Sequence, residues 1–239
     1  MAAYRSGMPR FFKSLTRSKS DVAPLMSHAA FSAIVLPAFD AVLSPLGFHQ
    51  RPDRLWVRSN DAPIRQMFHI AHWKGATASP SWGLSLDFVP HRAGDRLVWH
   101  RTDKTARVDA DLRVHDLSEP YHLSMLATET DLRARLAQVL PLSLMDAQDF
   151  WDAGRTVDRL PALFEQVEAE IGTRRKDHPW ALAPQCRLAK AFAFRAAGRI
   201  KEGDAFLEKW IEAERQPHNQ DPLQPKAIAD LRQRFDAVS

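Results

Sequence analysis

Hydrophobic side chains first show a clear period between Ser27 and Gly47. They recur at the spacing of one helical face: Phe31, Ile34, Val35, Ala38, Phe39, Val42, Leu43 and Leu46. Ser27 can cap the first turn and Gly47 can end the helix in the left-handed conformation, while Pro37 is expected to kink its middle. The pattern predicts one amphipathic helix.

Strand-like runs follow this helix. Four of them, 54–58, 64–73, 82–89 and 97–101, are separated by turn-forming residues, as in an antiparallel meander. The third alternates most clearly, and its two faces are Trp82, Leu84, Leu86 and Phe88 on one side and Gly83, Ser85, Asp87 and Val89 on the other. We expect the first face to pack against the helix and the second to meet solvent. A weaker fifth strand is expected within 106–114.

After Pro120 the pattern is helical to the end of the chain. Helices are expected at 130–140, 156–171, 183–197, 201–215 and 225–237. The third and fourth meet at Ala197-Gly198-Arg199 and predict a hairpin that resembles a single tetratricopeptide-type unit. Because a solenoid needs about three repeats, we interpret this hairpin as accessory.

These elements predict an α+β fold, in which an N-terminal helix packs on an antiparallel sheet of four or five strands and a helical C-terminal region follows. We expect three parts. They are a basic flexible leader over 1–26, the α+β domain over 27–172 and a helical hairpin extension over 173–239.

The order of elements between residues 30 and 88 resembles a known family. The helix ends in Leu43, Leu46, Gly47 and Phe48, and strands at 55–58, 67–72 and 84–88 follow. This arrangement resembles the bacterial family called domain of unknown function 4304, over about residues 27–150. The resemblance implies a compact bacterial α+β domain, and it carries no reaction or catalytic residue with it.

Charge is unevenly distributed along the 239 residues. Positions 1–26 hold five basic residues and one acid, whereas the other 213 residues carry 28 of each sign, so the leader accounts for the whole net charge of +4. A neutral body argues against a basic nucleic-acid-binding face. Met26 directly precedes the Ser27 cap, and translation from Met26 would remove the basic leader altogether.

One cysteine, Cys186, excludes an internal disulfide and a multi-cysteine zinc site, and suits a reducing cytoplasm. We expect it to be buried and inert. The uncharged run 22–39 follows a basic leader, as in a signal peptide, but Ser27, His28, Ser32 and Pro37 interrupt it. We therefore expect a cytoplasmic protein without a membrane segment, although the Arg- and Ser-rich leader also has the composition of a transit peptide.

Four histidines in or beside the sheet, at 69, 72, 91 and 100, are the candidates for metal binding. His69 and His72 differ by an odd number, so on one strand they point to opposite faces. No His-Glu-x-x-His motif and no glycine-rich phosphate loop is present. We expect neither a metal nor a cofactor.

The best enzymatic candidate is Asp87 acting with His69 or His72 of a neighbouring strand, with Ser85 on the same face as Asp87. Such a pair would suit a hydrolase. The alternative for Asp87 is an exposed carboxylate on the solvent face of the sheet, which we favour. We therefore predict no catalytic residue.

Tryptophans and arginines interleave in the sheet region. Trp56 and Trp73, with Arg58 and Arg65, could form a platform on which single-stranded bases stack. The alternative is that the tryptophans are core, as the alternation already indicates for Trp82. These four residues, together with Asp87, His69 and His72, are the candidate binding residues.

The sequence favours a non-catalytic protein-interaction module, with an immunity-type role if a toxin gene lies beside it. A second hypothesis is single-stranded nucleic-acid binding through the basic leader and the sheet aromatics. A third, weaker one is a hydrolase that uses Asp87 with His69 or His72.

Overall fold

A computed structural model describes residues 25–59, 63–73, 76–99, 101–111, 120–174, 184–215 and 222–238. Helix α1 (His28–Leu43) begins where the sequence predicted, because the Ser27 side chain accepts a hydrogen bond from the backbone N–H of Ala30 at 3.1 Å. A 3₁₀ turn, η1 (Ser44–Leu46), follows α1, and Gly47 then takes a left-handed φ of 85°. The predicted ends of this helix are confirmed. Pro37 lies inside α1, which continues past it.

The main sheet is antiparallel, with strand order β1-β2-β3-β4-β7. Its strands are β1 (His49–Arg51), β2 (Leu55–Ser59), β3 (Ile64–Trp73), β4 (Thr77–Leu86), β7 (Ala110–Asp111) and β8 (Leu123–Ser124), which also pairs with β4. A 3₁₀ turn, η2 (Pro52–Arg54), joins β1 to β2. The predicted α+β class, with its N-terminal helix on an antiparallel sheet and helices after it, is confirmed.

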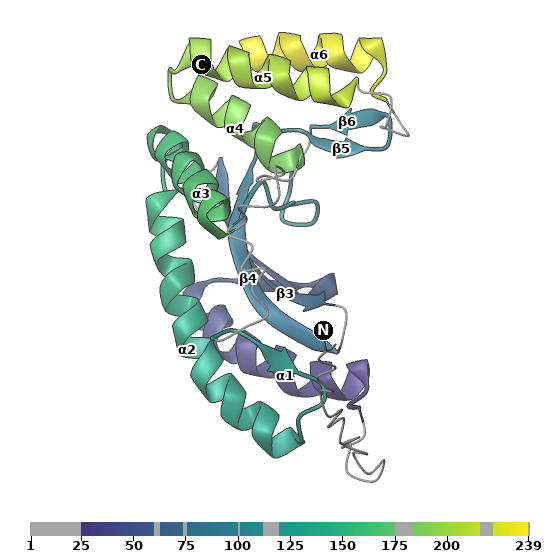
Figure 1. The fold of residues 1–239 in the computed structure, drawn as a ribbon, viewed down its shortest axis with the longest axis vertical. Helices are drawn as coiled ribbons and strands as arrows, with labels where there is room; N and C mark the ends of the chain where they lie inside the picture. Colours follow the sequence, from purple (N-terminus) through teal and green to yellow (C-terminus); the bar gives the residue numbers. More distant parts are fainter. Residues whose placement is uncertain are drawn as a thin grey trace, which may run out of the picture.

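One face of the sheet carries an aromatic core. Trp56, Phe68 and Trp82 are direct cross-strand neighbours on β2, β3 and β4, so their side chains lie in one row. Phe39 of α1 packs on Phe68 with ring centroids 5.4 Å apart, and Trp151 of α2 (Glu129–Ala153) packs on the same ring at 6.4 Å. Helices α1 and α2 therefore cover this face, as Figure 1 shows.

The opposite face is also covered, contrary to the expected solvent-facing side. Val57 and Met67 pair across β2 and β3 and form a second, small core with Ala106 of the segment that leads to β7. Ser85 is fully buried on this face. The sequence could not show this, because the covering segment 101–111 is rich in charge and has little strand character of its own.

Three predicted strands differ in the structure. The run predicted at 82–89 belongs to β4, which begins at Thr77, within the stretch expected to be a turn, and ends at Leu86. The run at 97–101 does not join the main sheet: β6 (Arg96–Val98) pairs with β5 (His91–Ala93) in a separate hairpin, with Gly94 at a φ of 65° in its turn. Of the weak fifth strand, only β7 forms within the described residues.

Helix α2 runs through Pro141, although the sequence predicted an end at residue 140. Its buried side chains lie on both sides of the proline, and include Leu136, Val139, Ala147 and Phe150. The burial of these side chains stabilises the helix by more than the hydrogen bond lost at the proline costs. After a 3₁₀ turn, η3 (Val157–Arg159), α3 (Leu160–Arg174) begins four residues later than predicted.

The C-terminal helices are α4 (Pro184–Ala196), α5 (Ile200–Glu214) and α6 (Pro225–Asp236). Helices α4 and α5 pack together as the predicted hairpin, with Gly198 at a φ of 79° in the turn. Gly203 allows α5 to lie close to α4, since a Cβ at this position would lie 3.0 Å from the carbonyl oxygen of Ala191 in α4. Phe192 and Phe235 join α4 to α6 with ring centroids 4.9 Å apart.

The hydrophobic core is continuous from α1 to α6. Helix α4 contacts both α3 and β7, and Figure 1 shows α4, α5 and α6 stacked beside the β5–β6 hairpin at one end of the sheet. The predicted boundary at 172/173 falls within α3. The predicted leader, up to residue 24, lies outside the described residues.

Candidate functional site

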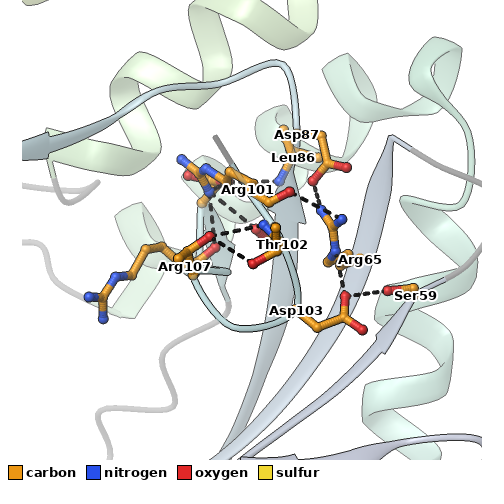
Figure 2. A network of polar contacts seen from close by, with 11 residues as sticks. Ser59, Arg65, Leu86, Asp87, Arg101, Thr102, Asp103 and Arg107 are labelled. Carbon is orange, nitrogen blue, oxygen red and sulfur yellow. Dashed lines mark hydrogen bonds and ion pairs between the residues drawn. The ribbon is translucent and has the colours of Figure 1, made fainter. Parts of the chain in front are cut away.

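Polar side chains gather under the segment 101–111, where it crosses the sheet (Figure 2). At the centre lies an ion pair between Arg101 and Asp109, whose side chains are both fully buried. Asp109 also accepts hydrogen bonds from the backbone N–H of Leu86 at 2.7 Å and from Gln185 Nε2 at 2.6 Å. One carboxylate thus ties β4, the covering segment and α4 together.

Burial raises the pKa of Asp109 from 3.8 to about 6. The Arg101 guanidinium and the hydrogen bonds from Leu86, Arg101 and Gln185 oppose this shift, because they favour the charged carboxylate. The burial of the charge outweighs them.

A second set of contacts surrounds Arg65 at the rim of the same region, and Figure 2 shows it between two carboxylates. Arg65 forms an ion pair with Asp87, and its Nε lies 2.8 Å from Asp103 Oδ1. Asp103 also accepts a hydrogen bond from the Ser59 hydroxyl at 2.5 Å, which lowers the pKa of Asp103 together with the Arg65 charge. Asp87 is therefore the partner of an arginine, and it is mostly buried rather than freely exposed.

The structure does not bring Asp87 together with His69 or His72. His69 pairs with Ser81, whereas Asp87 lies six residues further along, where its backbone N–H bonds to the carbonyl of Pro63. At about 3.3 Å per residue the separation is on the order of 20 Å. The backbone of His72 is further still, opposite Ala78, and its side chain lies outside the described part of the chain. The predicted acid–base pair is wrong because the register separates its members.

At Trp56 the alternative of a core tryptophan, which the sequence favoured, is confirmed, and the stacking platform is wrong. This side chain is fully buried, and its Nε1 donates to Asp40 Oδ1 of α1 at 3.0 Å. Trp82 is buried, as predicted, and Trp99 packs on Phe192 of α4. The side chain of Trp73 lies outside the described residues.

Arg58 is fixed within the fold. Its Nε donates to Gln66 Oε1 at 2.6 Å, its Nη1 donates to the carbonyl of Leu46 at 2.8 Å, and its guanidinium lies 4.7 Å from the centre of the Phe48 ring. Burial lowers the pKa of Arg58, with Asp152 opposing the shift. Arg58 and Arg65 thus hold the structure together by internal contacts.

The remaining candidates are the histidines at 91 and 100 and the single cysteine. Burial lowers the pKa of His91, and the charges of Arg101 and Arg107 add to this effect. His100 lies outside the described residues. In the part of the chain that the structure describes, no three His, Cys, Asp or Glu side chains lie close enough to hold a metal ion. Cys186 is buried, as expected, with its Sγ 3.6 Å from Asp111 Oδ1.

A surface hollow of about 550 Å³ lies at the edge of the sheet beside β1. Its lining comes from α1, β1 and η2, and consists of Leu36, Gln50, Arg51, Pro52 and Arg54. Two guanidinium groups line it, and none of its described lining side chains is a carboxylate. Such a lining suits a negatively charged group.

Both arginines of the hollow have unusual features. Arg54 has a φ of 61°, a left-handed conformation that non-glycine residues seldom adopt. Arg51 donates from Nη2 to the carbonyl of Lys104, while its Nη1 is buried and makes no hydrogen bond within the described structure. Such strain and unmet hydrogen-bonding capacity are typical of functional sites.

Neither Arg51 nor Arg54 was among the candidate binding residues that the sequence indicated. A signal was present in Arg51-Pro52-Asp53-Arg54, a short break between two strands that carries two arginines. The contacts of Asp109 with Gln185 could not be foreseen, because 76 residues separate them in the chain.

One helical span among the described residues, His28–Leu46, is long and apolar enough to cross a membrane by length and composition alone. In this structure five of its apolar side chains are part of the core: Phe31, Ile34, Val35, Phe39 and Leu43 are buried. The absence of a membrane segment stays a prediction, as does the cytoplasmic location.

Comparison of the chain with protein-family models, curated proteins and solved structures returned no match. The resemblance to domain of unknown function 4304 and the tetratricopeptide-like character of the hairpin therefore stay predictions.

Proposed function

We propose that this protein is a non-catalytic protein-interaction module. The observation that carries the proposal is the open, basic hollow at the free edge of the sheet, beside β1. Arginine stays protonated and cannot act as a general base, so Arg51 and Arg54 are suited to binding rather than to proton transfer.

The ion pairs and the positions of the candidate acid–base carboxylates support the same function. Asp87 is neutralised by Arg65 and is remote from His69, and Asp109 is enclosed with Arg101. A catalytic acid or base must reach its substrate, and the fully buried Asp109 carboxylate does not. An immunity-type role is one form of this function, in which the partner would be a toxin.

Affinity capture tests the proposal. The purified, tagged protein is incubated with lysate of its natural source, and retained proteins are quantified by mass spectrometry. We expect one partner at near-equal molar ratio that survives 150 mM salt. A bait that retains no stoichiometric partner would contradict the proposed function.

A further inference from the structure

We propose that the hollow formed by Arg51, Arg54 and Gln50 binds an acidic, extended segment of the partner protein. This inference rests on the proposed function and adds the site and the chemistry of its ligand. Residues of β1 and η2 supply all three side chains.

Charge selects the ligand. Two guanidinium groups, of Arg51 and Arg54, line the hollow, and none of its described lining side chains is a carboxylate. A ligand carboxylate would offset these positive charges. The chain's own leader is a poor occupant, since residues 1–26 hold five basic residues and one acid.

The sheet edge selects an extended peptide over a small anion. β1 is the terminal strand of the sheet, no described strand pairs with its outer side, and His49 and Gln50 are exposed. The outer backbone groups of an edge strand can pair with an added segment. A peptide can use these groups and the two arginines together, whereas a free anion can use only the arginines.

Two other arginines of the sheet already bind groups within the fold, which distinguishes them from the arginine of the hollow. Arg58 and Arg65 have their donors directed at Gln66, Leu46, Asp87 and Asp103. Arg54, in contrast, makes no hydrogen bond or ion pair with any described residue, so its guanidinium is available to a ligand.

A binding titration tests the site directly. A fluorescein-labelled peptide of ten glutamates is titrated with the full-length protein at 25 mM salt and followed by fluorescence anisotropy, with a ten-glutamine peptide as the neutral control. We expect saturable binding of the glutamate peptide, weakened at least tenfold in the double variant R51Q/R54Q. Glutamine keeps a polar side chain at both positions, and far-UV circular dichroism checks that the variant is folded.

The matched control is R96Q, because Arg96 is an exposed strand arginine in the separate β5–β6 hairpin. We expect R96Q to bind the glutamate peptide as the wild type does. Equal weakening by R96Q, or no saturable binding, would overturn the inference. So would displacement of the peptide by inorganic phosphate or tighter binding of a single-stranded oligonucleotide, since either would assign the arginines to phosphate groups.

Failure here is distinguishable from failure of the proposed function. If R51Q/R54Q captures the same stoichiometric partner from lysate as the wild type does, the hollow is not the docking site but the interaction function stands. If neither protein captures a partner, the interaction function itself is contradicted.

Discussion

Arg54 occupies a backbone conformation that its own side chain disfavours. A left-handed non-glycine residue costs about 1 kcal/mol, and glycine adopts the same φ without that cost. Arg54 is exposed to the hollow and forms no polar contact among the described residues that would offset the strain. The residue therefore fits a binding role better than a structural one.

We expect Arg54→Gly to raise the free energy of unfolding by about 1 kcal/mol, because it relieves the φ of 61°. The same change should weaken binding of the glutamate peptide. Urea denaturation measures the first effect, and Arg54→Gln is the control, since it removes the charge but keeps the strain. A loss of stability in the glycine variant would show that the arginine side chain supports the turn.

Asp109 makes stability depend on pH. Its pKa in the folded protein is raised to about 6 from 3.8, so between these pH values the folded state holds a proton that the unfolded state has lost. This contribution to stability is fully present below pH 3.8 and disappears as the pH rises through 6. A shift of this size corresponds to about 3 kcal/mol.

Asp109→Asn should remove that dependence. From pH 4 to pH 7 we expect the wild type to lose about 2.4 kcal/mol of unfolding free energy relative to the variant, as measured by urea denaturation at each pH. Other titrating groups are common to both proteins and cancel in the difference. A wild type that gains stability relative to the variant over this range would mean that pairing with Arg101 outweighs burial.

Among the elements, β4 is the most constrained. Its partners are β3 on one side and β7 and β8 on the other, and Gly83 pairs with Asp111 of β7. A Cβ at Gly83 would lie 2.5 Å from the carbonyl oxygen of Ala110, which is backbone and cannot yield cheaply. At Gly154, an added Cβ would instead meet the ends of the Leu84 and Leu163 side chains.

Gly83→Ala should therefore destabilise the protein by about 3 kcal/mol, at the upper end of overpacking costs, and Gly154→Ala should cost less. Thermal and urea denaturation of the two variants give the comparison. An equal or smaller loss for Gly83→Ala would contradict the observed approach of β7 to β4.

Element types were largely predictable because local patterns encode them. The alternation around Leu84 and Leu86 and the helical stripe containing Phe31 and Val35 both reflect burial on one side. The site was not predictable from these patterns. Whether an arginine forms an ion pair depends on the register of the strands and on the position of the covering segment. Arg65 forms ion pairs with Asp87 and Asp103, whereas Arg54 has no described partner.

At the scale of the whole molecule, the helical extension is part of the main core. Phe192 of α4 packs against Phe235 of α6 and against Trp99, which follows β6, and Gln185 bonds to Asp109 beneath the covering segment. Contacts so interwoven should make unfolding cooperative.

We expect tryptophan fluorescence and far-UV circular dichroism to report one coincident urea transition. Phe192→Ala should lower its midpoint for both probes, with a loss of about 3–5 kcal/mol. Separate transitions, or a shift in only one probe, would mean that residues 173–239 unfold as an independent unit.

Site-specific photo-crosslinking can detect a partner protein docked at the basic edge of the sheet. A photoreactive phenylalanine analogue replaces Gln50 beside the hollow, or Arg96 as the control, and the protein is irradiated in cells of its natural source. We expect one discrete protein adduct from position 50 that is lost when R51Q/R54Q is added, and no such adduct from position 96. No adduct at position 50, or the same adducts from both positions, would contradict docking at this edge.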